Sequence, residues 1–465
     1  MAGPAPDWRA LERAVSGAVL RPGDAGYDAA RKPAIARFHD ARPDAVVRCR
    51  TAGDVAAAIA FAHAAGLRVA ARSGGHDFAG RSTTDGVVVD VGPMDAVALG
   101  PDGVATIGAG ARLARVYDAL AAQGRTIPAG CGPEVGAAGL VLGGGIGLLG
   151  RMHGLTCDAL LGAEVVLADG RIVDCDADRE GDLFWALRGA GAGGFGIVTA
   201  LRVATLPSPP VATRLHVVFR DEDAAAVVGA WQGWAVDGPD ELAATLLLGD
   251  GGVVVTGAHI GPRADAERCV GDLGARAGAR PASILLEEGS YHAVKRALSG
   301  LGGVDEALSE GHALSRSELF DRALPYDAVR ALVAHLREEA GGATRELDLT
   351  PLGGAYGGVA PDASAFAHRS ARFVLKHTAV VAADAAEADR AAARDWLERS
   401  FAIVHPWGSG GVYPNFPEPE LDGWARAYHG DNLERLAAIR ARYDPDDVLR
   451  GPQTIPSGAT AATGG

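Results

Sequence analysis

The stretch Arg72-Ser73-Gly74-Gly75-His76-Asp77-Phe78-Ala79-Gly80 decides how the rest of the chain is interpreted. Residues 66–71 before it and 86–91 after it have the composition of short buried strands, so the stretch is a loop between them. Its glycines let a ligand approach the main chain closely, and successive backbone N–H groups form a nest for a phosphate. Arg72 can add a charge-assisted contact to such an anion. Taken alone, the stretch fits a tight turn with a solvent-exposed histidine equally well.

Composition and charge exclude several classes of protein. The chain has 465 residues, of which 48% are hydrophobic and 22% charged, as in a soluble globular protein of two or three domain-sized units. A net charge of −14 argues against a nucleic-acid partner and against an anionic membrane surface. The sequence contains no apolar run long enough for a transmembrane helix and no signal-peptide pattern, so we expect a cytoplasmic protein.

The cysteines give no sign of a structural framework. The sequence has 5 of them, an odd number, and they are widely spread without metal-ligand spacing. A disulfide framework and a metal site are therefore not expected. The cysteines are Cys49, Cys131, Cys157, Cys175 and Cys269.

Two further segments are unusually rich in glycine. The first covers residues 128–158 and the second residues 191–199. So much glycine is incompatible with a regular helix or strand throughout, and it favours backbone wrapped closely around a large flat ligand. Between the two segments, Asp169-Gly170 is flanked by apolar runs and predicts a β-hairpin.

The segment 145–150 also matches the G-x-G-x-x-G pattern of dinucleotide-binding folds. Residues 140–142 would be the preceding strand, and Glu164 or Asp169 lies at about the distance expected for a ribose contact. However, the pattern lies inside a longer glycine run, and Gly154 interrupts the helix that it should open. An NAD-dependent Rossmann dehydrogenase is therefore the less favoured alternative.

The glycine loops, taken in order with Tyr413-Pro414-Asn415 and Tyr443-Asp444-Pro445, carry a more specific signal. Together they resemble the berberine-bridge-enzyme-like family of FAD-linked oxidases, which has the vanillyl-alcohol-oxidase fold, over about residues 40–455. The resemblance implies an α+β fold with a split PCMH-type FAD-binding domain, made from residues 1–205 and 406–465. Residues 206–405 would then form a substrate domain with an antiparallel sheet backed by helices. The proline-rich break at 206–210 and the change of amino-acid composition near 405 agree with that division into domains.

The resemblance also implies the residues that hold FAD. The loop 72–77 would cradle the pyrophosphate, and His76 would bond to the flavin 8α carbon; the alternative is a noncovalent loop histidine. Tyr413 and Asn415 match the family's Tyr-x-Asn motif near the flavin ring. At position 194, in the last glycine loop, this chain has a glycine where the family usually has an asparagine. The implied cofactor-binding residues are Arg72, Ser73, Gly74, Gly75, His76, Asp77, Cys131, Gly136, Gly139, Gly143, Gly144, Gly145, Gly147, Gly154, Asp158, Gly196, Ile197, Val198, Tyr413 and Asn415.

Cys131 is a candidate for a second flavin bond, with one difficulty. Many family members have the pattern Gly-x-Cys-Pro-x-Val-Gly, but here residues 130–136 place the family's cysteine position on Gly132, one residue after Cys131. Glycines on both sides make the backbone pliable, so a bond to the ring and a free buried thiol both stay open. Cys157 lies in the following segment and is interpreted as a core residue.

The implied activity is that of an oxidase. FAD supplies the redox chemistry, and the protein must supply position and a base. Tyr413 is the first candidate for that base and Tyr356 the second, although Tyr356 could equally be a packed aromatic residue. The substrate would be an alcohol, a sugar or a secondary-metabolite intermediate, the electron acceptor O2, the product hydrogen peroxide, and the protein a monomer. A flavin-bearing protein that binds a drug or confers resistance to it is the other alternative.

Overall fold

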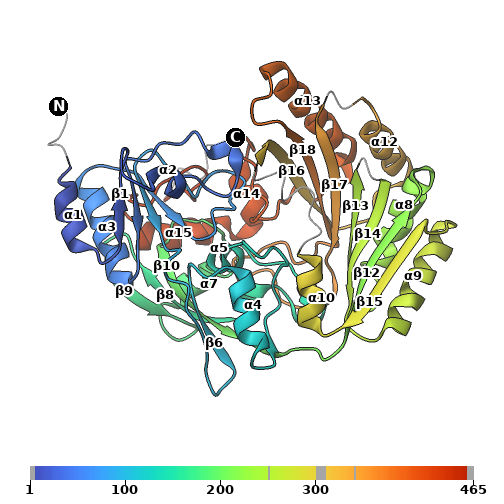
Figure 1. The fold of residues 1–465 in the computed structure, drawn as a ribbon, viewed down its shortest axis with the longest axis horizontal. Helices are drawn as coiled ribbons and strands as arrows, with labels where there is room; N and C mark the ends of the chain where they lie inside the picture. The colour runs from blue at the N-terminus through green and yellow to red at the C-terminus, as the bar shows by residue number, and fades with distance from the viewer. Residues whose placement is uncertain (1–5, 250–251, 300–309, 340–341, 458–465) are drawn as a thin grey trace.

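The computed structural model of this protein describes residues 6–249, 252–299, 310–339 and 342–457. Figure 1 shows two parts side by side, each built on its own sheet or sheets. The blue-to-teal N-terminal half and the red C-terminal helices gather in one part, and the green-to-orange middle of the chain forms the other. The fold is α+β, as predicted.

The first part begins with a small sheet in the order β1-β2-β4-β3. The pairs β2–β4 and β3–β4 are parallel, and β1 adds to β2 in the antiparallel sense. Thr51 caps the start of α3, because its side chain accepts a hydrogen bond from the Asp54 N–H. The elements are α1 (Trp8–Ala14), β1 (Ala18–Leu20), α2 (Tyr27–Ala30), η1 (Ala36–Phe38), β2 (Ala45–Arg48), α3 (Ala52–Ala64), β3 (Val69–Arg72) and β4 (Val87–Asp90).

A second sheet of the first part has the order β5-β6-β10-β8-β9, and all its neighbouring strands are antiparallel. The predicted hairpin is confirmed: Gly170, with φ +84°, lies in the turn between β8 and β9. The elements are β5 (Val97–Leu99), β6 (Val104–Gly108), α4 (Leu113–Ala121), β7 (Arg125–Thr126), η2 (Thr156–Ala159), β8 (Leu160–Val166), β9 (Ile172–Cys175), α7 (Gly181–Ala186), β10 (Ile197–Ala204) and β11 (Leu206–Pro207).

The glycine-rich segment excludes the dinucleotide fold. Residues 140–142, which that alternative needs as a strand, are the end of helix α5 (Ala137–Leu142). The helix after the glycines, α6 (Gly150–His153), has only 4 residues. Strand β8 follows it and pairs antiparallel with its neighbours, so the parallel βαβ unit of a Rossmann fold is not formed here.

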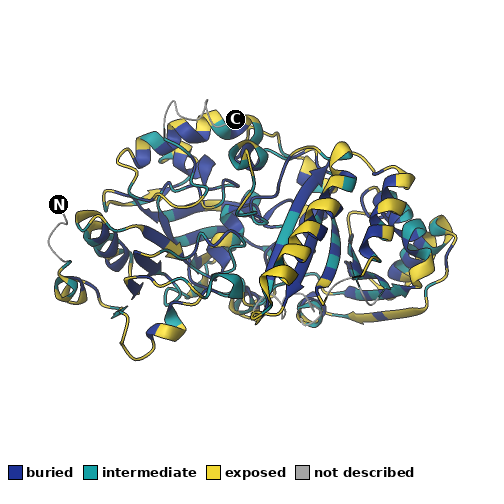
Figure 2. Cartoon of the chain, turned by 90° about the horizontal axis from the view of Figure 1, so that it is seen from above, coloured by how far each residue is buried: buried dark blue, intermediate teal, exposed yellow. Residues whose placement is uncertain are grey.

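The second part is a seven-stranded antiparallel sheet in the order β15-β12-β14-β13-β17-β18-β16. Helices α8, α9, α12 and α13 cover one of its faces, with their exposed sides turned outward (Figures 1 and 2). The strands are β12 (Ala212–Phe219), β13 (Leu242–Gly249), β14 (Gly252–His259), β15 (Ser283–Gly289), β16 (His312–Phe320), β17 (Thr344–Pro351) and β18 (Phe373–Val381). The helices are η3 (Asp221–Asp223), α8 (Ala224–Trp234), α9 (Arg263–Ala277), α12 (Tyr326–Leu336), η4 (Gly354–Gly357) and α13 (Glu387–Val404).

The sheet's free face looks toward the first part. Along β13 and β17, buried leucines such as Leu246 and Leu349 alternate with half-buried residues such as Thr245 and Thr350. Because successive side chains of a strand point to opposite faces, the leucines pack against the helices and the others face away from them. One helix of this part, α10 (Tyr291–Leu298), lies next to α4 of the first part (Figure 1).

The chain then returns to the first part. After η5 (His405–Trp407) it forms α14 (Trp424–His429), η6 (Gly430–Asn432) and α15 (Leu433–Tyr443), and α15 contacts α7. The predicted boundary 205/206 lies between β10 and the short strand β11, and the boundary 405/406 lies within η5. These limits stay predictions.

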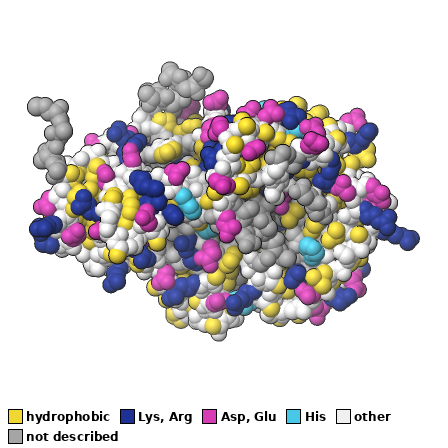
Figure 3. All heavy atoms as spheres, turned by 45° about the horizontal axis from the view of Figure 1, so that its top comes forward, with side chains coloured by type: hydrophobic (Ala, Val, Ile, Leu, Met, Phe, Trp, Pro, Cys, Tyr) yellow, Lys and Arg dark blue, Asp and Glu magenta, His cyan; other side chains and the backbone are white. Residues whose placement is uncertain are grey.

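On the face of the molecule that Figure 3 shows, acidic and basic side chains are intermixed, and neither charge dominates. Within the described residues, no helix is long and apolar enough to cross a membrane. The same residues contain no group of three or more His, Cys, Asp or Glu side chains that could hold a metal ion.

Candidate active site

A cavity of about 1640 Å³ lies between the two parts of the molecule. Pockets for one small ligand usually measure about 300–1,000 Å³, so this cavity has room for a dinucleotide-sized ligand and a second small molecule. Its walls come from the loop after β3, both glycine-rich segments, the C-terminal segment and the free face of the large sheet.

The loop after β3 is pressed against the first glycine-rich segment. A Cβ atom on Gly74 would lie 2.3 Å from the backbone nitrogen of Gly136, so only glycine allows this approach. Gly75 has φ +76°, and its carbonyl accepts a hydrogen bond from the Ala34 N–H at 3.0 Å. The Ser73 hydroxyl donates to the Ala109 carbonyl at 2.6 Å. The loop is therefore fixed by its own residues, with its backbone toward the cavity.

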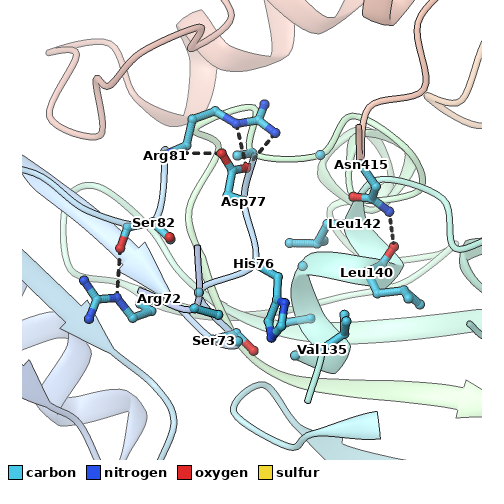
Figure 4. A pocket seen from close by; sticks show the side chains of 18 of the residues that line it. Arg72, Ser73, His76, Asp77, Arg81, Ser82, Val135, Leu140, Leu142 and Asn415 are labelled. Carbon is cyan, nitrogen blue, oxygen red and sulfur yellow. Dashed lines mark hydrogen bonds and ion pairs between the residues drawn. The ribbon is translucent and has the colours of Figure 1, made fainter. Parts of the chain in front are cut away.

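An ion pair neutralises the acidic residue of this loop. The Asp77 carboxylate accepts hydrogen bonds from the backbone of Ala79 and Arg81 and from the Arg81 guanidinium, at 2.8 to 3.0 Å. The Arg81 guanidinium also donates to the Pro414 carbonyl at 3.4 Å. As a result, Asp77 presents little negative charge to an anionic ligand, and the loop is tied to the segment that carries Tyr413. In Figure 4 the His76 ring points the other way, toward Val135.

The C-terminal segment closes the end of the cavity near residues 194–198. Gly194 has φ +81°, and a Cβ on it would lie 2.9 Å from Nη1 of Arg440. The Arg440 guanidinium pairs with the Asp444 carboxylate at 3.0 Å, and both side chains are fully buried. The glycine at 194 thus leaves room for the buried arginine that anchors the C-terminal segment.

Tyr413 presents its hydroxyl to a cluster of hydrogen-bond donors at the cavity wall. Its oxygen accepts from the backbone N–H groups of Gly145 at 2.9 Å and Ile146 at 3.2 Å, and from the Asn415 amide at 3.1 Å. Burial raises the pKa of Tyr413 to about 12, whereas these three hydrogen bonds act to lower it. The donors therefore favour the ionised phenol at a site that otherwise opposes it.

Tyr356 is held differently. Its hydroxyl donates to the Gly147 carbonyl and accepts from the Gly147 N–H, both at 3.1 Å. Burial raises its pKa. A Cβ on Gly150 would lie 1.7 Å from the same hydroxyl. Because both hydrogen-bonding functions are used on Gly147, this geometry favours a packing role over proton transfer.

The opposite wall, on the free face of the large sheet, is polar. The Thr245 and Thr350 hydroxyls are 3.2 Å apart, and Thr350 donates to the Asp348 carboxylate at 2.9 Å. The Lys376 ammonium lies 3.4 Å from the same carboxylate and 4.8 Å from the centre of the Phe416 ring. The four polar side chains form one connected network across β13, β17 and β18, aimed at the cavity.

Two family models match the chain on either side of this large sheet. The model described as an FAD binding domain matches residues 43–176, and the model described as berberine and berberine like matches residues 412–456. An uncharacterized FAD-linked oxidoreductase of Bacillus subtilis, YgaK, is 30% identical over 451 residues, which is 95% of this chain and 97% of that protein. The chain belongs to the berberine-bridge-enzyme-like family of FAD-linked oxidoreductases.

Other members of the family are oxidases with known substrates. The chitooligosaccharide oxidase of Gibberella zeae is 30% identical over 431 residues, covering 89% of this chain and 87% of that protein. The solved structure of the glucooligosaccharide oxidase of Acremonium strictum, with a 6-S-cysteinyl, 8α-N1-histidyl FAD, matches with a TM-score of 0.88 at 26% identity. That match covers 98% of this chain and 100% of the other.

The cavity of this family member fits FAD. Glycine loops, whose backbone N–H groups suit phosphate binding, line the cavity, and the one acidic residue of the first loop is neutralised by Arg81. Many of the predicted cofactor residues line the cavity: Ser73, Gly74, Gly75, His76, Asp77, Cys131, Gly136, Gly139, Gly147, Gly196, Ile197, Val198, Tyr413 and Asn415.

The Arg72 side chain is engaged away from the predicted anion contact, which stays a prediction. Although the residue borders the cavity, its guanidinium donates to the backbone carbonyls of Ala30, Arg31 and Ser82 at 2.5 to 3.0 Å. Figure 4 shows the side chain turned away from His76. Arg72 therefore ties the N-terminal segment to the loop.

A second group of predicted residues lies behind the cavity wall instead of in it: Gly143, Gly144, Gly145, Gly154 and Asp158. The first three make room for side chains, since added Cβ atoms would lie 2.0 Å from Asn415, 3.2 Å from Phe366 and 2.2 Å from Thr156. Asp158 is paired with Arg369 through two contacts of 2.7 and 2.8 Å, beside Gly154. These residues support the wall but are not among the residues that line the cavity.

The polar network of the large sheet was missed by the sequence analysis. A signal for it exists, because residues 346–350 alternate polar and apolar types as Glu-Leu-Asp-Leu-Thr. Such alternation marks a strand with one buried face. The pattern does not reveal that the second face of this strand borders the cavity and not solvent.

Proposed function

We propose that this protein is an oxidase that removes a hydride from a small organic substrate with an FAD bound covalently through His76. O2 is the electron acceptor and hydrogen peroxide the second product. The substrate carries a hydroxyl or amine on the carbon that is oxidised, as in alcohols, sugars and secondary-metabolite intermediates. The protein acts as a monomer, with residues 1–205 and 406–465 as the FAD-binding domain and residues 206–405 as the substrate domain.

The observation that carries the proposal is that His76 and Tyr413 line one cavity, although they are far apart in the sequence. His76 comes from a loop of the small N-terminal sheet, and Tyr413 from the segment by which the chain returns to that part. Arg81 links the two segments through Asp77 and the Pro414 carbonyl. A flavin attached to His76 would therefore lie at a fixed distance from the Tyr413 hydroxyl, which accepts the substrate's proton.

Each residue has a defined task. The backbone of loop 73–77 binds the pyrophosphate, and His76 keeps the ring in place. Tyr413 accepts the proton of the substrate's hydroxyl or amine, and the N–H groups of Gly145 and Ile146 stabilise the charge on its oxygen during that transfer. The network around Asp348 and Lys376 orients the substrate's remaining polar groups from the opposite wall. FAD held by these residues would supply the hydride acceptor and the route for the electron pair to O2.

The first test is the link to His76. Cys131→Ser, in which His76 is the one proposed attachment point, should keep its flavin on a denaturing gel, where the protein band should fluoresce. Adding His76→Ala to this variant should remove that fluorescence completely. If the double variant keeps its flavin through denaturation, the attachment is elsewhere.

The second test is the reaction. Wild-type protein is incubated with a panel of alcohols, amines, mono- and oligosaccharides, and both flavin bleaching without air and peroxide formation in air are recorded. At least one compound should produce both signals. Tight binding of a compound without bleaching or peroxide would instead support the drug-binding alternative.

A further inference from the structure

A buried lysine lies directly behind the part of the cavity wall that carries Cys131. Lys295, on α10, is only 3% exposed. Its ammonium donates to the Ala129 carbonyl at 2.7 Å and to the Tyr291 hydroxyl at 3.3 Å, and lies 3.7 Å from the centre of the Tyr117 ring. All three neighbours are uncharged groups, so the ammonium is solvated by the protein without a counter-ion among them.

Cys131 is electrostatically coupled to Lys295. Burial lowers the pKa of Lys295 to about 8, and Cys131 acts to raise it. Burial raises the pKa of Cys131, and Lys295 opposes that rise. A buried charge without a carboxylate partner is unfavourable for folding, and such groups gather at functional sites.

The same cluster fixes the main chain in front of Cys131. Lys295 holds the carbonyl of Ala129, and the Tyr117 hydroxyl donates to the next carbonyl, that of Gly130, at 2.5 Å. Cys131 itself packs against the small apolar cluster that contains Tyr291. The two preceding peptide groups are thus anchored to side chains of α4 and α10, and Cys131 follows them at the cavity wall.

The position of α10 is itself secured on the outer side. The Asp118 carboxylate of α4 lies 3.2 Å from the His292 ring and 3.5 Å from the Arg296 guanidinium. Two residues of α10 therefore meet one carboxylate of α4, and Lys295 lies between these two residues in the sequence.

We propose that Lys295 is a positioning residue that directs Cys131 into a thioether bond with the flavin ring. The inference rests on the proposed function, because it needs FAD in the cavity. The thiolate is the reactive form of cysteine, and an adjacent ammonium favours it. Lys295 thus makes the cysteine competent although it stands one residue before the position expected from the family pattern.

The step balances with O2 as the oxidant. The Cys131 sulfur forms a bond to ring carbon C6, and the thiol hydrogen and the hydrogen of C6 both leave as protons. The electron pair released with them passes to O2, which becomes hydrogen peroxide. One thiol, one FAD and one O2 therefore give one thioether-linked FAD and one hydrogen peroxide.

The test measures the bond and not the activity. Wild type, Lys295→Gln, Lys295→Met, Lys295→Arg and Cys131→Ser are produced in parallel and digested, and mass spectrometry quantifies flavin joined to the His76 peptide alone or to both peptides. Gln keeps a donor for the Ala129 carbonyl but no charge, Met removes both, and Arg keeps the charge. Tyr291→Phe serves as a matched control, because it removes a neighbouring hydroxyl and leaves the ammonium.

We expect doubly linked flavin in wild type, Lys295→Arg and Tyr291→Phe, and at least a tenfold smaller doubly linked share in Lys295→Gln and Lys295→Met. The His76 link and the total FAD content should stay unchanged in all of them. A wild type with flavin on His76 only, or neutral variants with the wild-type share, overturns the role of Lys295 while the proposed function stands. A wild type without any attached flavin overturns the proposed function as well.

Discussion

Replacing Tyr413 with phenylalanine removes the acceptor of three hydrogen bonds and leaves the ring in place. Asn415 keeps a partner, because its amide also donates to the Leu140 carbonyl at 2.9 Å. The N–H groups of Gly145 and Ile146 lose their acceptor at the wall. A buried donor without a partner costs about 1–3 kcal/mol, so the two together should lower the free energy of unfolding by about 2–6 kcal/mol.

The same change should slow the reaction. A general base contributes a factor of about 10²–10⁴, so we expect flavin reduction to slow by at least about a hundredfold. Thermal unfolding, followed by circular dichroism, measures the first effect, and stopped-flow reduction without air, with a substrate found in the panel, measures the second. The thermal midpoint should fall by about 2–6 °C, because a chain of 465 residues unfolds with an entropy of about 1 kcal/mol/K.

Tyr27→Phe is the matched control. The Tyr27 hydroxyl is also buried and donates one hydrogen bond, to the Pro43 carbonyl at 2.6 Å, away from the cavity. Its loss should cost about 1 kcal/mol and leave flavin reduction unchanged. If Tyr413→Phe is as stable as Tyr27→Phe and reduces its flavin at the wild-type rate, both the stabilising and the catalytic roles given to Tyr413 are refuted.

Two further predictions concern buried charges. Asp444→Ala should lower the free energy of unfolding by about 3 kcal/mol, because the N–H groups of Val448 and Leu449 lose their acceptor while Arg440 keeps Asp447 as a partner; a midpoint within error of wild type would contradict this. Burial raises the pKa of Glu418 to about 7, with Arg316 opposing the rise, so the folded protein retains a proton that the unfolded chain has released. Stability should therefore fall between the ordinary pKa of 4.5 and about 7 as pH rises. Glu418→Gln should flatten this dependence, and midpoints whose slope with pH equals that of wild type would refute the assignment.

The sequence was informative where the backbone itself limits the choice of residue. Gly74 and Gly75 are required by a close approach and by a left-handed φ, so their residue type alone predicts a special loop at this point of the chain. The turn at Gly170 and the cap at Thr51 follow from equally local rules. Such requirements are met within a few residues, and a single sequence therefore reveals them.

The sequence was ambiguous where a residue type serves two purposes. Glycine admits a ligand, but it equally admits a neighbouring side chain, and Gly143 makes room for Asn415 from the far end of the chain. Arg72 turns toward the carbonyls of Ala30 and Arg31 because the N-terminal segment happens to pack there. Which partner a residue meets depends on long-range packing, and no spacing in the sequence encodes it.

Lys295 illustrates the same limit. In the sequence it is one basic residue in a short amphipathic helix, and a solvent-exposed position is the ordinary expectation. Only the docking of α10 on α4 buries it behind Cys131. The residue pair was beyond sequence reasoning because its members come from different parts of the molecule.

The alternation along the large sheet has a consequence for how this protein can acquire new substrates. Thr245 and Thr350 border the cavity, while Leu246 and Leu349, their neighbours in the strands, are fully buried. Mutation at one set of positions explores new chemistry, and mutation at the other set endangers folding. A variant library restricted to every second residue of β13 and β17 would therefore sample specificity at little risk to stability, and natural descendants could diverge by the same route.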